Sequence, residues 1–404
     1  MLARRLAVPV AVALLAFPAR AQERQTPLAP TPGQGKLSIE TPEFSIRVRG
    51  YLQADDRHVF GDGPWSDALL IRRARAVLEG AAFGRVEVKI MADFAASPML
   101  YDAYVDGKLT PWLRLRFGKD KVPISLERLR SARDQLFGER AQPGVFAPVR
   151  EIGAQILAAP WDGRLAASFG VMQAAPDGVN PDIFGSDGGG DDKDVIGRVF
   201  VRPFPRGALR ELGLGISGSL GSATGSATTP RLPTYKTTAQ LSYFSYRPEA
   251  VAFDQRAHLG VQLHCAAGPV ELMAEAVESV EGVKVGDQVG RFANGAYSIE
   301  LAFLPTGEHA SFEGVLPRKP FDPTHGRFGA LMVAVRQQGT RFDRRAFPVF
   351  ADPQTAAAGA LGVGASLTWI WNGIFQLQSS WETTTFDGKR RDEHVLVTRA
   401  QAAF

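Results

Sequence analysis

The stretch W-L-R-L-R-F-G at residues 112–118 carries arginines on one face of an extended chain and large apolar side chains on the other. Side chains of a strand point to alternate sides, so Arg114 and Arg116 share one face, and Leu113, Leu115 and Phe117 share the opposite one. In a soluble sheet the apolar face packs in the core and the arginines meet water. In a membrane barrel the apolar face meets lipid and the arginines line the lumen. The choice between these two structures largely determines the function.

The N-terminal residues are typical of an export signal. Arg4 and Arg5 precede an apolar stretch at 6–17, and A-R-A follows at 19–21. That stretch is too short for a membrane anchor, and no later segment reaches the roughly 20 apolar residues of a transmembrane helix. We therefore expect a signal peptide at 1–21, a flexible leader containing Pro and Gly at 22–43, and a single domain at 44–404.

Charge and cysteine content exclude further classes of protein. The formal net charge is +4, and it falls to +1 once the three arginines of the signal (Arg4, Arg5 and Arg20) are removed. So balanced a chain gives no support for nucleic-acid binding. The single cysteine, Cys265, rules out an intramolecular disulfide framework in spite of the export signal.

Beyond residue 44 the chain is a series of alternating segments broken by turn residues. Roughly seventeen segments occur, mostly about 9–12 residues long, which matches tilted membrane strands and exceeds the usual five or six residues of soluble ones. Bacterial barrels of this kind have an even number of strands. We therefore expect an all-β fold, a transmembrane antiparallel β-barrel of 16 or 18 strands. Clear examples of alternation are 44–53, 85–94, 256–265 and 395–404.

The connections between these segments divide into tight turns and long loops. In the first half they roughly alternate, as in outer-membrane barrels with short periplasmic turns and longer outer loops, and in the second half this order blurs. A terminal aromatic residue, Phe404, on the last strand also favours such a barrel. The tight turns are 80–84, 107–111, 160–163 and 372–373, and the long connections are 119–150, 173–193 and 221–235.

A secreted soluble β-sandwich or propeller, for example a carbohydrate-binding protein, is the alternative architecture. No propeller-type repeat is visible, and the mixed ladders of charge on the polar faces fit a wet lumen. A barrel enzyme would need a Ser/His/acid set on its lipid-facing rim, and no segment presents one, so we expect no catalytic residues. His258 and His264 lie six residues apart on one strand face, too far for one metal ion, and we expect neither metal nor cofactor.

A series of motifs resembles the phosphate-selective porin O/P family of outer-membrane porins. The motifs are R-R-A-R-A-V-L-E-G at 72–80, D-A-Y-V at 102–105, L-R-F-G-K-D-K-V-P-I-S-L-E at 115–127, R-E-I-G-A-Q at 150–155, F-L-P-T-G-E at 303–308 and R-A-Q-A-A-F at 399–404. Pro305 departs from the family pattern, and so do Asp120 and Val122, which interrupt the commoner G-K-F-K-x-P-F. The resemblance implies a sixteen-stranded homotrimeric porin whose third outer loop, here 119–150, folds into the channel and forms its constriction.

This loop is rich in positive charge. An anion that enters a narrow pore loses water, and arginine forks, lysine ammonium groups and hydroxyls are the donors that can replace it. We expect Lys121 and Arg133 to be central to anion binding, with Lys119 and Ser125 beside them. A carboxylate such as Asp93 would orient arginines and keep binding weak enough for release. The loop's basic residues are Lys119, Lys121, Arg128, Arg130, Arg133, Arg140 and Arg150, against Asp120, Glu127, Asp134 and Glu139.

Further arginines on the polar strand faces are expected to form an approach ladder that concentrates anions. Arg73, Arg75, Arg114 and Arg116 are the members nearest the loop, and Arg72 falls on the opposite face from Arg73. The sequence thus predicts passive, anion-selective diffusion of phosphate or polyphosphate across the bacterial outer membrane, in contact with its lipid. The alternative is a general or other-oxyanion porin without a specific phosphate site. The remaining expected members of the ladder are Arg47, Arg49, Arg198 and Arg202.

Overall fold

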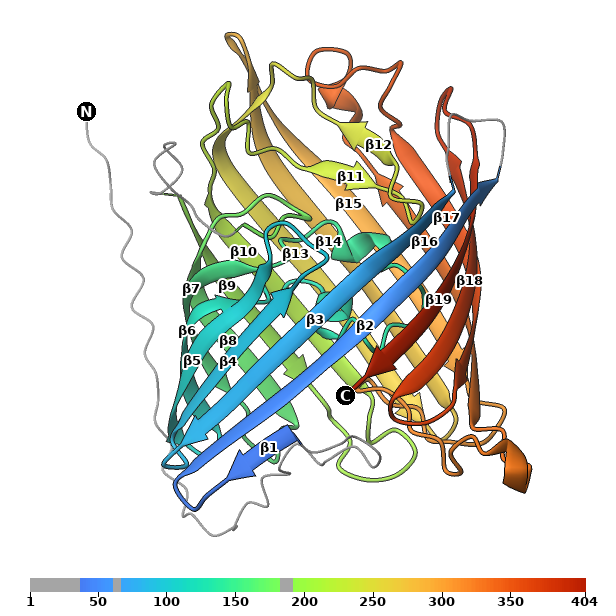
Figure 1. The fold of residues 1–404 in the computed structure, drawn as a ribbon. Helices are drawn as coiled ribbons and strands as arrows, with labels where there is room; N and C mark the ends of the chain where they lie inside the picture. Colours follow the sequence, from blue (N-terminus) through green and yellow to red (C-terminus); the bar gives the residue numbers. More distant parts are fainter. Residues whose placement is uncertain (1–36, 61–66, 182–191) are drawn as a thin grey trace.

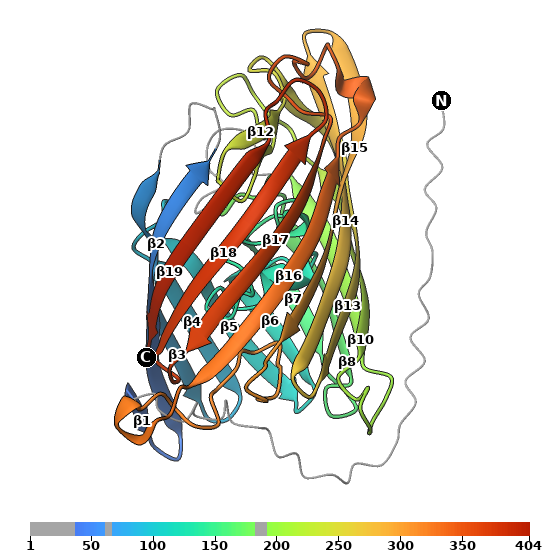
Figure 2. The same cartoon turned by 90° about the vertical axis from the view of Figure 1, so that its right-hand side faces the viewer.

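The computed structural model describes residues 37–60, 67–181 and 192–404, and within them sixteen antiparallel strands close into a barrel (Figures 1 and 2). The strands follow one another around the wall in chain order, which confirms the smaller of the two expected strand numbers. The expected signal peptide and the leader up to residue 36 lie outside the described residues. The wall consists of β2 (Phe44–Phe60), β3 (Ala68–Ala82), β4 (Val86–Asp93), β5 (Leu100–Thr110), β6 (Leu113–Asp120), β7 (Glu151–Ala158), β8 (Leu165–Gln173), β9 (Lys193–Val201), β10 (Gly213–Ser222), β13 (Val251–Ala267), β14 (Val270–Val285), β15 (Gln288–Phe303), β16 (Ala330–Arg341), β17 (Gly359–Ile370), β18 (Phe375–Phe386) and β19 (Glu393–Ala403).

A few short elements lie outside this wall. Strand β1 (Leu37–Glu40), which falls within the expected leader, pairs antiparallel with β2. Within the described residues, no helix is both long enough and apolar enough to cross a membrane. The other short elements are β11 (Thr234–Lys236), β12 (Ser242–Ser245), α1 (Leu126–Leu129), η1 (Gln142–Gly144), η2 (Pro323–His325) and η3 (Arg344–Ala346).

The seam of the barrel joins the first and last wall strands. Tyr51 of β2 lies opposite Ala403 of β19. Beyond that pair, the Gly50 amide donates to the Phe404 carbonyl at 3.0 Å, and the Phe404 amide donates to the Gly50 carbonyl at 2.9 Å. A Cβ atom at Gly50 would lie 2.6 Å from the Phe404 ring, so a glycine is needed for the ring to pack there. The C-terminal residue Phe404 therefore helps to hold β2 and β19 together at the seam.

Burial along β6 decides between the two structures that the sequence left open. Phe117 is 57% exposed on the outside of the wall. Arg116 points inward and forms an ion pair with Asp106, which is 1% exposed, at 2.7 Å. The same inversion occurs on β16, where Val335 is 50% exposed and Arg336 is buried. Apolar residues outside and charged residues inside are typical of a barrel in lipid.

Aromatic residues mark the edge of the apolar band at the end of the barrel that holds the C-terminus. Trp369 stacks on Phe328 with ring centroids 4.9 Å apart and contacts Trp371 at 5.1 Å. Trp381 and Phe60 form a second outward pair at 5.3 Å, farther along the wall. Such girdles are typical of the membrane–water interfaces of outer-membrane barrels.

The two ends of the barrel differ in their connections, with exceptions that explain the blurred order in the sequence. Short turns such as 83–85 join strands at the end with the C-terminus, and long loops such as 121–150 lie at the other end (Figure 1). In the second half, the turn at 286–287 is short although it lies at the long-loop end. The connection at 304–329 is long although it lies at the short-turn end.

The largest apolar core lies inside the barrel rather than between layers. Phe146 of the 121–150 loop packs on Tyr235 of β11 with centroids 4.3 Å apart. Phe342, which follows β16, stacks on Phe244 of β12 at 3.9 Å. These aromatic contacts tie three separate loops together inside the outer half of the barrel. The side chains of this core fill the part of the barrel interior that lies beside β13 to β17.

A charge on the lipid-facing wall tests this topology. Val335 points outward near the middle of β16, so Val335→Arg should destabilise the barrel by about 2–4 kcal/mol, because the guanidinium group must enter hydrocarbon. Val335→Leu, which stays apolar, should change stability by less than about 0.5 kcal/mol. Urea titration of the folded fraction in lipid vesicles measures both values. Equal stability of the two variants would contradict the outward assignment.

Candidate functional site

The 121–150 loop crosses the barrel interior and is fixed to the far wall. Glu275 of β14 accepts hydrogen bonds from the Leu126 amide at 2.7 Å and the Ser125 hydroxyl at 3.1 Å. Arg130 forms a buried ion pair with Glu271 at 2.8 Å. Further along the loop, backbone groups bond to side chains of β16 and β18. The loop therefore lies against the β14–β18 wall, and on its other side Ala132 and Glu139 accept hydrogen bonds from β2 and β3.

A basic cavity of about 190 Å³ lies between the loop and the β2–β5 wall. Its lining contains seven basic side chains and one acidic side chain. The wall contributes four of the eight charged groups, namely Arg49, Arg75, Lys89 and Asp102, and the loop contributes Lys121, Arg133, Arg140 and Arg150. Tyr51, Ser131 and Phe404 complete its polar and aromatic lining.

The wall cations of this cavity have carboxylate partners. Arg75 donates to Asp93 at 2.7 Å and to the Tyr51 hydroxyl at 2.8 Å. Lys89 lies 2.9 Å from Asp102, and that carboxylate is shared with Arg150 of the loop, also at 2.9 Å. Acidic residues of the wall therefore hold these cations in fixed orientations and offset part of their charge.

Two loop cations are held by backbone carbonyls instead. The Lys121 ammonium donates to the carbonyls of Leu129 at 2.7 Å and Arg130 at 3.1 Å. Arg140 donates to the carbonyl of Glu127 and, at 3.2 Å, to that of Arg130. In the described part of the chain, neither has a carboxylate within ion-pair distance. Carbonyl dipoles satisfy their donors without cancelling their charge, so the loop side of the cavity has an excess of positive charge.

Burial of these groups shifts their titration. Burial, together with the guanidinium groups of Arg150 and Arg140, lowers the pKa of Lys121 well below its usual value. Burial lowers the pKa of Arg140 to about 10, so it stays charged at neutral pH. Burial also raises the pKa of the Glu127 carboxyl, which weakens its offset of the charge of Arg140 near neutral pH. An anion in the cavity would relieve the unfavourable burial of these positive charges.

Six of the basic residues named in the sequence analysis line this cavity. They are Lys121, Arg133, Arg140 and Arg150 of the loop and Arg49 and Arg75 of the wall, and Asp93 binds Arg75 from behind. Arg73 lies on the neighbouring wall, where it donates to Gln53 at 2.7 Å. The structure therefore brings the two residues expected to be central into one basic cavity.

Other predicted residues lie elsewhere. Ser125 bonds to Glu275 on the far wall, and Lys119 donates to the Leu100 carbonyl at 2.8 Å. Arg114 and Arg116 line a second hollow of about 340 Å³ toward the C-terminal end of the barrel, which shares Lys89 with the first. This hollow has as many acidic as basic side chains, namely Glu40, Glu79, Glu87 and Asp106 against Arg47, Lys89, Arg114 and Arg116.

The interpretation of Arg72 needs a correction. Strict alternation places it opposite to Arg73, but the register between β2 and β3 shifts at Gln53, so that Arg72 has no partner in the ladder. This bulge turns both arginines toward Glu139 of the loop, with Arg72 at 2.5 Å and Arg73 at 3.8 Å. A bulge inserts one extra residue and breaks the period of two, so alternation alone does not reveal it.

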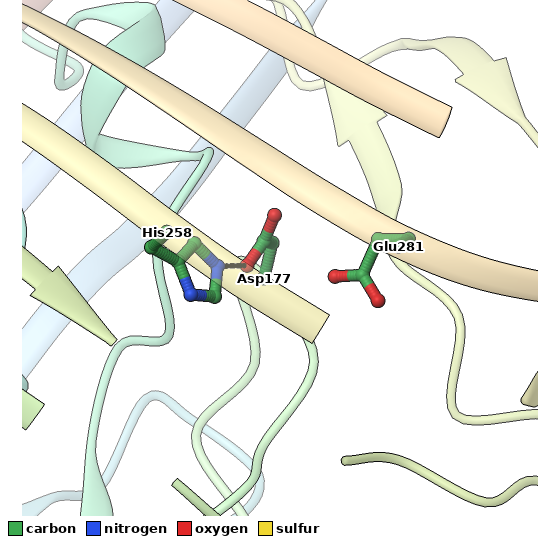
Figure 3. A group of neighbouring side chains, drawn as sticks. All are labelled: Asp177, His258 and Glu281. Atoms are coloured by element: carbon green, nitrogen blue, oxygen red, sulfur yellow. Dashed lines mark hydrogen bonds and ion pairs between the residues drawn. The ribbon is translucent and has the colours of Figure 1, made fainter. Parts of the chain in front are cut away.

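A second buried cluster was missed because its members are far apart in sequence (Figure 3). Asp177, which follows β8, accepts from His258 of β13 at 2.8 Å, and Glu281 of β14 lies beside them. One potential ligand atom from each residue lies within 4.8 Å of the others. Arg256 is 3.8 Å from Asp177, and Ser219 binds the other imidazole nitrogen at 2.7 Å. Arg256 thus already provides a positive charge beside these carboxylates. The contacts of Asp177 also fix the 174–181 segment to the wall.

Comparison with known proteins supports the assignment of the fold as an outer-membrane porin barrel. The family model for phosphate-selective porin O and P matches residues 46–358. A search of curated protein sequences finds no match. Among solved structures, the outer membrane channel DcaP of Acinetobacter baumannii is similar with a TM-score of 0.57 and 12% identity, covering 91% of this chain and 99% of that one.

Two further structures show the same fold. OmpT of Vibrio cholerae in its trimer form has a TM-score of 0.55 and 9% identity, covering 90% of this chain and 100% of that one. An anion-selective porin from Comamonas acidovorans has a TM-score of 0.52 and 12% identity, with coverage of 90% and 100%. Fold and family together indicate an outer-membrane channel rather than an enzyme. With 313 consecutive residues, from 46 to 358, matched by the family model, the chain belongs to the phosphate-selective porin O and P family.

Proposed function

We propose that the protein lets small anions diffuse passively across the outer membrane, with phosphate or polyphosphate favoured, and that the 121–150 loop forms the constriction. The observation that carries this proposal is the composition of the cavity, which has seven basic groups and one acidic group. Lys121 and Arg140 have no carboxylate partner in the described residues. An oxyanion is the counter-charge that such a site lacks.

The chemistry of the lining suits an oxyanion. A guanidinium group offers paired N–H donors that match two oxygens of one phosphate, and it keeps its charge throughout the physiological pH range. The Lys121 ammonium adds a compact charge, and the Ser131 hydroxyl is a further donor that lines the cavity. The wall carboxylates Asp93 and Asp102 compete with the anion for the same arginine and lysine side chains. This competition keeps binding weak enough for the anion to leave, as conduction requires.

Processing and assembly complete the proposal. The segment 1–21 acts as the export signal and is removed, the leader at 22–43 precedes the barrel domain at 44–404, and the mature protein assembles as a homotrimer. The alternating segments and the basic N-terminus support the first two statements. The trimer form of the structurally similar OmpT supports the third.

Block of chloride current by phosphate tests the anion site. In planar bilayers, added phosphate should reduce chloride conductance through the wild-type channel. Lys121→Ala combined with Arg133→Ala should raise the phosphate concentration for half-block by roughly tenfold or more, because charge-assisted hydrogen bonds of about 1.5–3 kcal/mol are lost. Arg210→Ala is the matched control, since this arginine is 69% exposed in a turn and lines neither hollow. Unchanged wild-type chloride current at millimolar phosphate would favour a general porin.

The pH dependence of ion selectivity tests the role of the loop. Burial raises the pKa of Asp134 to about 6, and this carboxyl lies 3.6 Å from Arg133. At pH 5 it is mostly neutral and at pH 7.5 mostly charged, so it offsets Arg133 only at the higher pH. The reversal potential in a KCl gradient should therefore show stronger anion selectivity at pH 5, and Asp134→Asn should reduce the difference. An identical pH shift in both proteins would argue against a conduction path beside Arg133.

A further inference from the structure

The lipid-facing wall has an apolar hollow of about 590 Å³ over β7–β10 and another of about 550 Å³ over β13–β17, and the second of these is bordered by Glu278 and Arg341. Small residues of adjacent strands form its floor, where Ala276, Gly295 and Gly339 meet. Its sides are Leu259, Val261, Tyr297 and Leu361. A Cβ atom at Gly339 would lie 2.6 Å from the Tyr297 ring, so the glycine lets that ring lie flat over the sheet. The hollow is therefore apolar and has the size of a small-molecule site.

Charged side chains border this hollow on one edge only. Glu278 and Arg341 lie there and form an ion pair at 3.5 Å. Arg341 lies at the last position of β16, and Trp369 lies opposite Leu331 near the first. About ten steps of ~3.3 Å separate Leu331 from Arg341, and at a strand tilt of roughly 45° they span a height of ~23 Å, close to the ~25 Å apolar band of such barrels. Since Trp369 belongs to the girdle at the periplasmic margin, Arg341 lies at the outer margin, where the headgroups of the outer leaflet begin.

More arginines continue from this edge toward the outside. Arg291 points outward from β15, and Arg344 and Arg345 follow β16. The side chains of Arg341 and Arg345 are 74% and 73% exposed. Asp343 pairs with Arg345 at 2.5 Å, whereas Arg291 donates only to the neutral Gln255 at 3.0 Å. Four arginines thus stand above an apolar hollow, and two carboxylates offset them.

We propose that this surface binds a phosphorylated glycolipid of the outer leaflet, with one acyl chain in the hollow and a headgroup phosphate on Arg341 and Arg345. The two parts of the surface match the two parts of such a lipid. The apolar hollow lies at the depth of acyl chains, and the arginines lie at the depth of phosphates. Arginine forks bind phosphate oxygens in pairs, and the side chains of Arg341 and Arg345 stay largely exposed although each has one carboxylate partner.

Native mass spectrometry of the full protein released from detergent tests this assignment. The probe is lipid A with two phosphates, and phosphatidylglycerol is the comparison lipid. The wild type should retain lipid A, and Arg341→Gln combined with Arg345→Gln should retain at least about fivefold less, because charge-assisted hydrogen bonds to phosphate are lost. Ala276→Phe, which fills the hollow and leaves the arginines in place, should lower retention as well.

The controls separate this surface from general charge and from the channel. Arg210→Gln removes an arginine of similar exposure at the other end of the barrel and should retain lipid A like the wild type. All variants should keep the gel shift on boiling that reports a closed barrel, and chloride conductance should stay unchanged, since no altered residue lines the basic cavity. Equal retention by the double variant and the wild type overturns the proposal. Equal retention of phosphatidylglycerol and lipid A by the wild type overturns it too.

Discussion

The hydrogen-bonded closure of β2 on β19 is the constraint on which the remaining structure depends. Hydrocarbon offers no partner for a backbone N–H or carbonyl, so a sheet in lipid has to close on itself. Closure forces every wall strand to present one face to lipid and one to the lumen. The adjacent residues of β6 show this constraint, because Phe117 is exposed on the outside and Arg116 points inward to Asp106.

Inside the closed wall, the charge balance differs between the two sides of the loop. On the far wall, Glu271 neutralises Arg130 of the loop. On the near side, carbonyls replace carboxylates at Lys121 and Arg140. The same loop is therefore fixed on one side by neutralised pairs and electropositive on the other. Under the proposed function, its anchoring and its affinity for anions come from separate sets of residues.

Much of the fold could be predicted from the sequence, because alternation with a period of two survives along most strands. The two faces of β6 and a closed barrel of 16 or 18 strands follow from it, and the family resemblance favours sixteen. Three features break the period or lie outside it. The bulge at Arg72 shifts the register, Lys119 turns to a backbone carbonyl at the end of its strand, and the long connection at 304–329 lies at the end where short turns were expected.

The candidate site was only partly accessible for a different reason. Lys121 and Arg133 could be chosen because they lie in one charged loop. Their neighbours Arg49 and Lys89 come from strands more than thirty residues earlier in the chain, and only the path of the loop across the lumen brings them together. The cluster of Asp177 with His258 likewise spans 81 positions. Contacts of this kind depend on how the loop folds back, and no local pattern encodes them.

If anions cross the barrel through the basic cavity, as we propose, its small volume also sets how the flux depends on concentration. At about 190 Å³ it is below the range of ordinary small-molecule sites, so it accommodates one small anion at a time. A passage with single occupancy behaves like a carrier with one site: transport rises with concentration only until the site is filled. Further anions then wait for the first to leave, and the residence time on the loop's cations limits the throughput of the whole barrel.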